Sequence, residues 1–99
     1  MSDIDVDVMR SNAIEAAEVL KIMAHPERLM VLCKLTQGEV GVAELADQSD
    51  LSQSAFSQHL SVLRKHNLIS ARKESQQVFY TLQDKRVEAL ISSLQTVFC

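Results

Sequence analysis

The sequence predicts a mainly α-helical domain with one small β-hairpin, in the order α-α-α-α-β-β-α. Apolar residues recur at helical spacing over most of the 99 residues, and they alternate with polar residues only between Ile69 and Leu82. With 46% hydrophobic residues, one Pro and two Gly, the composition is that of a single globular domain over residues 1–99. No apolar stretch approaches the roughly 20 residues that a membrane span needs, so we expect no membrane partner.

The first two helices are delimited by a proline. We expect a helix over residues 7–23, preceded by a flexible acidic arm over residues 1–6. The residue before Pro26 disfavours helical backbone, whereas Pro26 itself suits the first turn of a second helix, which Gly38 closes. The acidic start is unlike the basic start of a secretory signal, and we therefore expect a cytoplasmic protein.

The middle of the chain has the pattern of a helix-turn-helix. A short helix is expected over residues 42–48 and a longer one over residues 53–66, for which Ser52 is a suitable N-cap. Apolar residues at helical spacing give the longer helix one inner face, formed by Phe56, Leu60 and Leu63. A short helix, a tight connection and a longer helix with an apolar inner face together predict a helix-turn-helix.

A β-hairpin and a last helix complete the pattern. Residues 69–72 and 78–82 alternate in polarity on the two sides of a polar, partly basic tip at residues 73–77, as expected of a wing that lies near phosphates. The last helix is expected over residues 84–98, with a broad apolar stripe. A core this small cannot easily cover both the first and the last helix. We therefore expect a winged helix-turn-helix homodimer that pairs through these two helices.

The charge of the chain is unevenly distributed. The net charge is −3, but residues 1–51 carry ten acidic and four basic residues, whereas residues 52–83 carry four basic residues and one acidic residue. Phosphate binding depends on the local field over about 8 Å at physiological salt, not on the total charge. The basic segment coincides with the predicted helix-turn-helix and wing. It favours a nucleic-acid partner, although an ordinary solvated surface can carry the same charge.

Three blocks of the sequence resemble the ArsR/SmtB family of bacterial winged-helix regulators. They are residues 20–29, 51–60 and 78–82, and the likeness runs from about residue 16 to residue 99. The resemblance implies a homodimeric transcriptional regulator, not an enzyme, that places a recognition helix in the major groove of a double-stranded DNA operator. The residues that it assigns to DNA contacts are Ser52, Gln53, Ser54, Ser57, Gln58 and His59 in the recognition helix and its cap, and Arg72, Lys73 and Gln76 in the wing.

The ligand positions of the metal-sensing members of this family are not matched. Residues 40–46, at the start of the third helix, contain no cysteine, and the last helix has Asp84 and Glu88 at its start but no histidine. Soft and borderline metals need thiolate or imidazole ligands. We therefore expect neither a metal nor another cofactor.

The two cysteines, Cys33 and Cys99, are too few for a secreted disulfide scaffold, and in a reducing compartment they should rest as thiols. Their places on the second helix and at the end of the last helix resemble those of an HlyU-like, thiol-sensing subgroup of the family, of the SqrR, BigR and YgaV type. This resemblance implies that a small oxidant or persulfide inducer links or modifies the two thiols. A terminal carboxylate and a helix C-terminus both disfavour a thiolate at Cys99. We therefore expect Cys33 to attack first and Cys99 to resolve the product, through a disulfide or a longer polysulfide.

Three alternatives stay open from the sequence. Cys33 could be only a small buried hydrophobe, which would leave an ArsR-like regulator without a thiol switch. A thiol-based redox enzyme would need a base beside its nucleophile. The nearest histidine in sequence, His25, is eight positions from Cys33, and no nucleophile–base arrangement can be recognised in the sequence. A winged helix can also serve protein partners alone, which salt-dependent binding to duplex DNA would exclude.

Overall fold

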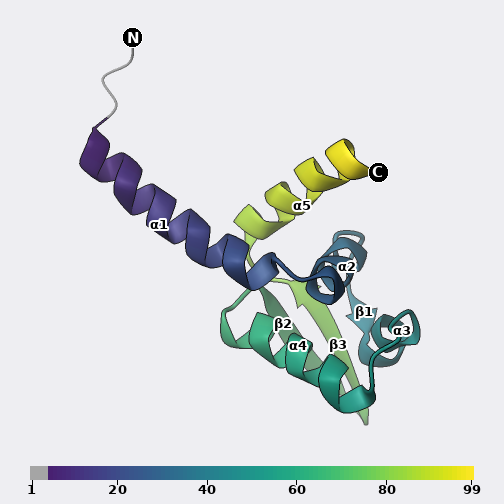
Figure 1. The fold of residues 1–99 in the computed structure, drawn as a ribbon. Coiled ribbons are helices and arrows are strands. Elements are labelled where there is room, and N and C mark those ends of the chain that lie inside the picture. Colours follow the sequence, from purple (N-terminus) through teal and green to yellow (C-terminus); the bar gives the residue numbers. More distant parts are fainter. Residues whose placement is uncertain (1–4) are drawn as a thin grey trace.

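The computed structural model describes residues 5–99, and its elements follow the predicted order with one additional short strand (Figure 1). The elements are α1 (Val6–Met23), α2 (Pro26–Leu35), β1 (Val40–Gly41), α3 (Val42–Asp47), α4 (Gln53–Lys65), β2 (Ile69–Glu74), β3 (Gln77–Leu82) and α5 (Lys85–Phe98). The predicted class, a mainly helical winged helix-turn-helix, is confirmed. Of the expected acidic arm, residues 1–4 lie outside the described residues, whereas Asp5 caps α1 and Val6 begins it.

Side-chain caps set the starts of α2 and α4. Nδ1 of His25 accepts a hydrogen bond from the backbone N–H of Glu27 at 3.1 Å, directly before Pro26 in the first turn of α2. The hydroxyl of Ser52 accepts one from the backbone N–H of Ala55 at 3.2 Å, as predicted. Each cap satisfies one of the backbone donors that the start of a helix leaves unpaired, and so determines where the helix begins.

The strand β1 was not predicted, and it extends the wing to a three-stranded antiparallel sheet in the order β1-β3-β2. It pairs with β3 in a register that places Val40 opposite Tyr80. The strands β2 and β3 pair as far as Glu74 opposite Gln77, so the hairpin tip is a two-residue turn, shorter than expected. Ser75 in that turn has a φ of 55°, in the left-handed region that such tight turns use.

One hydrophobic core joins the helices to the sheet. The inner face of α4 is buried as predicted, because Phe56, Leu60 and Leu63 are each no more than 4% exposed. The helix packs against α2 and β2. The remaining buried apolar residues are Met23, Val31, Leu32, Leu35, Leu45, Leu68, Ile69, Val87 and Ile91. This core holds α4 beside the wing and turns the opposite face of α4 toward solvent.

The helices α1 and α5 extend away from the core and diverge from one another (Figure 1). Met23 is the buried residue of α1, and apolar side chains such as Ile14 and Leu20 of that helix stay exposed. An open groove of about 450 Å³ lies between the two helices, and an ion pair joins Glu15 of α1 to Arg86 of α5 beside it. Although α1 is long, no helix within residues 5–99 is apolar enough at sufficient length to cross a membrane.

Candidate functional site

The outer face of α4 presents small polar side chains to solvent. Of the residues predicted to contact DNA, five are exposed on this face or at its cap, namely Ser52, Gln53, Ser54, Ser57 and Gln58. They lie away from the buried inner face of the helix, which packs on the core. An α-helix is about 10–12 Å across and fits a major groove about 12 Å wide. Amide and hydroxyl groups on such a face can form hydrogen bonds with base edges and phosphates.

His59 differs from these neighbours, because it is half-buried and turned toward the junction of α1 and α2. Its Nδ1 accepts a hydrogen bond from Nε of Arg28 at 3.1 Å, and its ring centroid lies 4.2 Å from that of His25. Arg28 also donates from Nη1 to the carbonyl oxygen of Ile22 at 3.0 Å. The structure thus places His59 in a contact that ties α4 to the end of α1 and the start of α2. The sequence did not predict the roles of His25 and Arg28, because Arg28 is 31 positions from His59.

This environment makes a pH dependence of stability testable. Burial, then the neighbouring His25 and Arg28, lower the pKa of His59 below its usual 6.5, and Glu27 opposes the shift. The unfolded chain therefore binds more protons than the folded chain between the lowered pKa and 6.5. The contribution of His59 to the free energy of unfolding is therefore complete above pH 6.5, and it is lost as the pH falls through the pKa that His59 has in the folded protein. We expect urea unfolding to show a lower free energy of unfolding at about pH 5.5 than at about pH 7.5.

The matched variant is His59→Gln, whose amide oxygen can still accept a hydrogen bond from Arg28 but does not titrate. We expect the variant to lose less stability than the wild type over the same pH interval. Equal losses in the two proteins would show that His59 does not contribute to the pH dependence.

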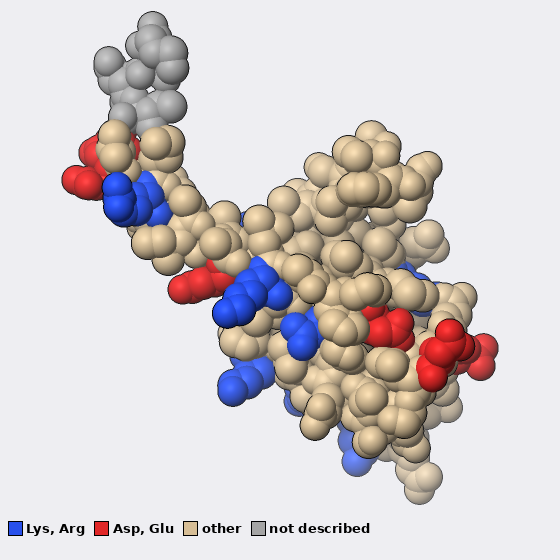
Figure 2. All heavy atoms as spheres, in the orientation of Figure 1, with Lys and Arg blue, Asp and Glu red and all other residues tan. Residues whose placement is uncertain are grey.

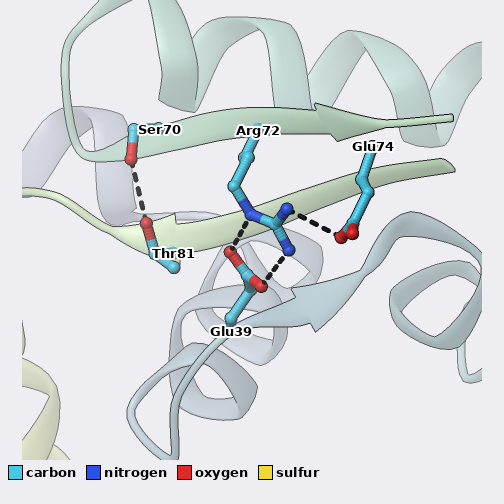
Figure 3. Close-up of polar contacts among 5 residues, drawn as sticks. All are labelled: Glu39, Ser70, Arg72, Glu74 and Thr81. Atoms are coloured by element: carbon cyan, nitrogen blue, oxygen red, sulfur yellow. Dashed lines mark hydrogen bonds and ion pairs between the residues drawn. The ribbon is translucent and has the colours of Figure 1, made fainter.

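The predicted wing residues Arg72, Lys73 and Gln76 are all exposed, but Arg72 already has partners (Figure 3). Its Nη2 and Nε donate to the two carboxylate oxygens of Glu39 at 2.7 and 3.0 Å, and its Nη1 donates to Glu74 at 2.8 Å. The guanidinium also lies 4.9 Å from the centroid of the Phe79 ring. The hydrogen bond to Arg72 lowers the pKa of Glu39, and the pKa of Arg72 is raised in turn. A phosphate that reaches Arg72 must therefore compete with two carboxylates.

The charged side chains are unevenly placed on the surface. Figure 2 shows Lys and Arg side chains on the side of the molecule that carries the end of α4, and Asp and Glu side chains near α3. Arg64 and Lys65 are in the last turn of α4, whereas Glu44 and Asp47 belong to α3. Arg64 and Lys65 of α4 and Lys73 of the wing are exposed, so they can attract an anionic partner.

The two cysteines lie in one apolar pocket of about 290 Å³ between α2 and α5. Cys33 is half-buried on α2, Cys99 follows α5 and is exposed, and both are free thiols. The other lining residues are Leu29, Ile91, Leu94, Gln95 and Phe98. Residues that are far apart in the sequence are thus brought to a common cavity, as two thiols that act together require.

Burial raises the pKa of the Cys33 thiol, and the nearby Cys99 raises it further, whereas a hydrogen bond with Gln95 lowers it. The largest of these effects is burial. The thiolate is the reactive form, so burial makes Cys33 less reactive toward reagents in bulk water. The sequence did not predict this effect, and the order of attack, with Cys33 first, stays a prediction. Gln95 is a further residue that the sequence did not single out.

Known proteins share both the sequence and the fold. Residues 25–71 match the model for bacterial regulatory proteins of the arsR family. The chain is 46% identical over 91 residues to the transcriptional activator HlyU of Vibrio cholerae, which corresponds to 92% of this chain and 84% of that protein. It is 40% identical over 99 residues to the biofilm growth-associated repressor of Agrobacterium fabrum, with coverage of 100% and 85%.

A solved structure described as reduced HlyU from Vibrio cholerae superposes with a TM-score of 0.87 at 46% identity, over 92% of this chain and 96% of that chain. The fold is therefore shared over nearly all of this chain. The chain therefore belongs to the ArsR family of bacterial transcriptional regulators.

Proposed function

We propose that the protein binds a specific DNA operator as a homodimer and that the thiols of Cys33 and Cys99 control its affinity. The observation that carries the proposed control by thiols is the shared pocket, because Cys33 and Cys99 both line the cavity between α2 and α5. A persulfide or another small oxidant is the proposed inducer. The similar proteins named above are called an activator in one case and a repressor in the other, and both names fit a protein that acts at DNA.

The DNA-contacting surface combines the outer face of α4 with the wing. Gln58 is exposed on α4, and its amide has the donor and acceptor that pair with an adenine edge. Lys73 and Gln76 are exposed at the end of the hairpin, where they suit phosphate contacts. His59 holds α4 against the junction of α1 and α2 through its contacts with Arg28 and His25, and so helps to position this surface.

The proposed dimer interface is the apolar surface of α1 and α5. The exposed apolar residues of these helices are Val6, Val8, Met9, Ile14, Leu20, Leu90, Val97 and Phe98. Such a large unpaired apolar surface is unusual for a monomer, and a second copy would cover it through a twofold contact. The groove between α1 and α5, with Ala16, Val19 and Leu90 in its lining, can receive a helix of the partner.

A link between the thiols would couple the pocket to the operator. It would tie the end of α5 to α2, which packs against both α4 and α5. Because α5 also lines the proposed dimer interface, its displacement would change the placement of the two copies of α4. Operator half-sites lie about 34–36 Å apart, so a small rotation of one copy weakens binding by the pair.

The test compares the reduced protein with the protein treated with an organic persulfide, using a duplex selected from a random pool by the reduced form. We expect the linked protein to bind this duplex about 5- to 150-fold more weakly, the usual size of coupling between two sites. Fluorescence anisotropy measures the affinity, and mass spectrometry shows whether Cys33 and Cys99 are joined and through how many sulfur atoms.

The variants Cys33→Ser and Cys99→Ser should bind the duplex as tightly as the reduced wild type and should not respond to the persulfide. If the wild type is fully linked and its affinity is unchanged, the protein is a regulator without a thiol switch. Sustained consumption of persulfide beyond one equivalent per thiol pair would instead indicate an enzyme.

A further inference from the structure

The charged side chains of the wing are balanced by a residue from outside the hairpin. The hairpin of β2 and β3 carries two basic residues and one acidic residue, namely Arg72, Lys73 and Glu74. The fold adds Glu39, which precedes β1, because one of its carboxylate oxygens lies 2.7 Å from Nη2 of Arg72 (Figure 3). The wing surface formed by these four side chains therefore has no net charge, although the sequence predicts a partly basic tip.

The contacts of Arg72 hold its guanidinium group in one orientation. Glu39 accepts two hydrogen bonds from it, from Nη2 at 2.7 Å and from Nε at 3.0 Å, and Glu74 accepts one from Nη1 at 2.8 Å. Arg72 also lies directly opposite Phe79 of β3, and its guanidinium is 4.9 Å from the centroid of that ring. Single ion pairs on a surface contribute little to stability, but a bidentate pair within a network is an exception.

This arrangement opposes a contact between Arg72 and a phosphate. The edge of the guanidinium that Glu39 occupies is of the kind that binds carboxylates and phosphates in a bidentate manner. A phosphate that takes this edge must break two charge-assisted hydrogen bonds, and it leaves the carboxylate of Glu39 unpaired beside it. Lys73 is different, because it is exposed and takes part in no ion pair within residues 5–99. The two adjacent cations of the wing are therefore not equally available to DNA.

We propose, on the basis of the DNA binding proposed above, that Glu39 limits the phosphate-dependent part of DNA affinity by holding Arg72 away from the DNA backbone. Phosphate contacts carry no direct information on sequence, so fewer of them leave a larger share of the binding to the outer face of α4. Glu39 is thus a specificity-determining residue that lies outside both the recognition helix and the hairpin.

The experiment measures how the affinity for a duplex of unrelated sequence depends on salt in the full-length variant Glu39→Gln. The amide keeps the shape of the side chain but is neutral, so a phosphate can displace it from Arg72. Each phosphate that is newly neutralised steepens the plot of log affinity against log salt by about 0.9, or about 2 for the two wings of a dimer. We therefore expect the gain in affinity over wild type to be about tenfold larger at about 50 mM salt than at about 200 mM.

The slope is the chosen readout because a change in the order of the wing alters affinity without releasing counterions. A double-mutant cycle repeats Glu39→Gln in the Arg72→Gln protein, which has no guanidinium group to release. Only the smaller general effect of removing a carboxylate is expected there. Glu74→Gln is the matched control, because it removes the same charge from beside Arg72 but leaves the bidentate pair in place, and it should steepen the slope less than Glu39→Gln.

An equal change of slope with and without Arg72 would overturn the proposal, since Glu39 would then act through its charge alone. An unchanged slope in Glu39→Gln, or an equal effect of Glu74→Gln, would also overturn it. Circular dichroism and size-exclusion chromatography check that each variant is folded and keeps the oligomeric state of the wild type. If the wild type binds no duplex even at low salt, the proposed function fails and this inference fails with it, whereas the other contrary results count against the role of Glu39 alone.

Discussion

Replacing Leu63 by alanine should lower the free energy of unfolding by about 3 kcal/mol, the typical cost of a Leu→Ala change in a packed core. Leu63 is fully buried on the inner face of α4, so the shorter side chain leaves a cavity between α4 and the rest of the core. A domain of this size has a stability of about 5–15 kcal/mol, and the loss is a large part of it. Urea unfolding at one fixed protein concentration measures the change.

The matched control is Ser61→Ala, an exposed position on the same helix, which should change stability by no more than about 0.5 kcal/mol. Operator binding by Leu63→Ala should fall only as far as the folded fraction falls. A loss of less than about 1 kcal/mol for Leu63→Ala would show that α4 does not depend on this contact for its position.

Replacing Gln58 by alanine should weaken binding to the selected operator by about 1–3 kcal/mol, or about 5- to 150-fold. Gln58 is exposed on the outer face of α4, and no other described group holds its amide in a hydrogen bond, so the amide is free to pair with a base edge. The change removes no charge. We therefore expect the dependence of affinity on salt concentration to keep its slope, and the discrimination between operator and unrelated DNA to fall.

Gln37→Ala removes the same kind of side chain at an exposed position after α2, away from α4, and should leave operator affinity unchanged. Size-exclusion chromatography and thermal unfolding should give the same results for both variants as for the wild type. If Gln58→Ala weakens binding to operator and unrelated DNA equally, Gln58 does not read the sequence of the operator.

Features that depend on neighbours along the chain could be predicted from the sequence. The start of α4 follows from Ser52, and the buried face of α4 follows from the spacing of Phe56, Leu60 and Leu63. The strand β1 could not be predicted in this way, because two residues are too few to show an alternating pattern and their partner strand lies about 40 positions further along the chain. It forms because β3 offers an unpaired edge at that place.

Contacts between distant residues account for the other differences at the candidate site. The spacing of Phe56 and His59, three positions apart, already places His59 at the margin of the inner face, but only the packed structure shows Arg28 and His25 beside it. The pairing of Arg72 with Glu39 spans 33 positions and has no local signal. The family resemblance identified both cysteines, whereas the apolar pocket around them required the positions of α2 and α5.

Besides the core contacts of β2 and β3, the wing is joined to the body of the domain through the pairing of β1 with β3 and through the contact of Arg72 with Glu39. A free hairpin would lose conformational entropy when it settles on a phosphate backbone, at about 0.5–1.5 kcal/mol for each immobilised side chain. Here the strands are ordered before any ligand arrives. The wing is therefore a preorganised surface, and the phosphate contacts that we propose for it would require little further loss of conformational entropy.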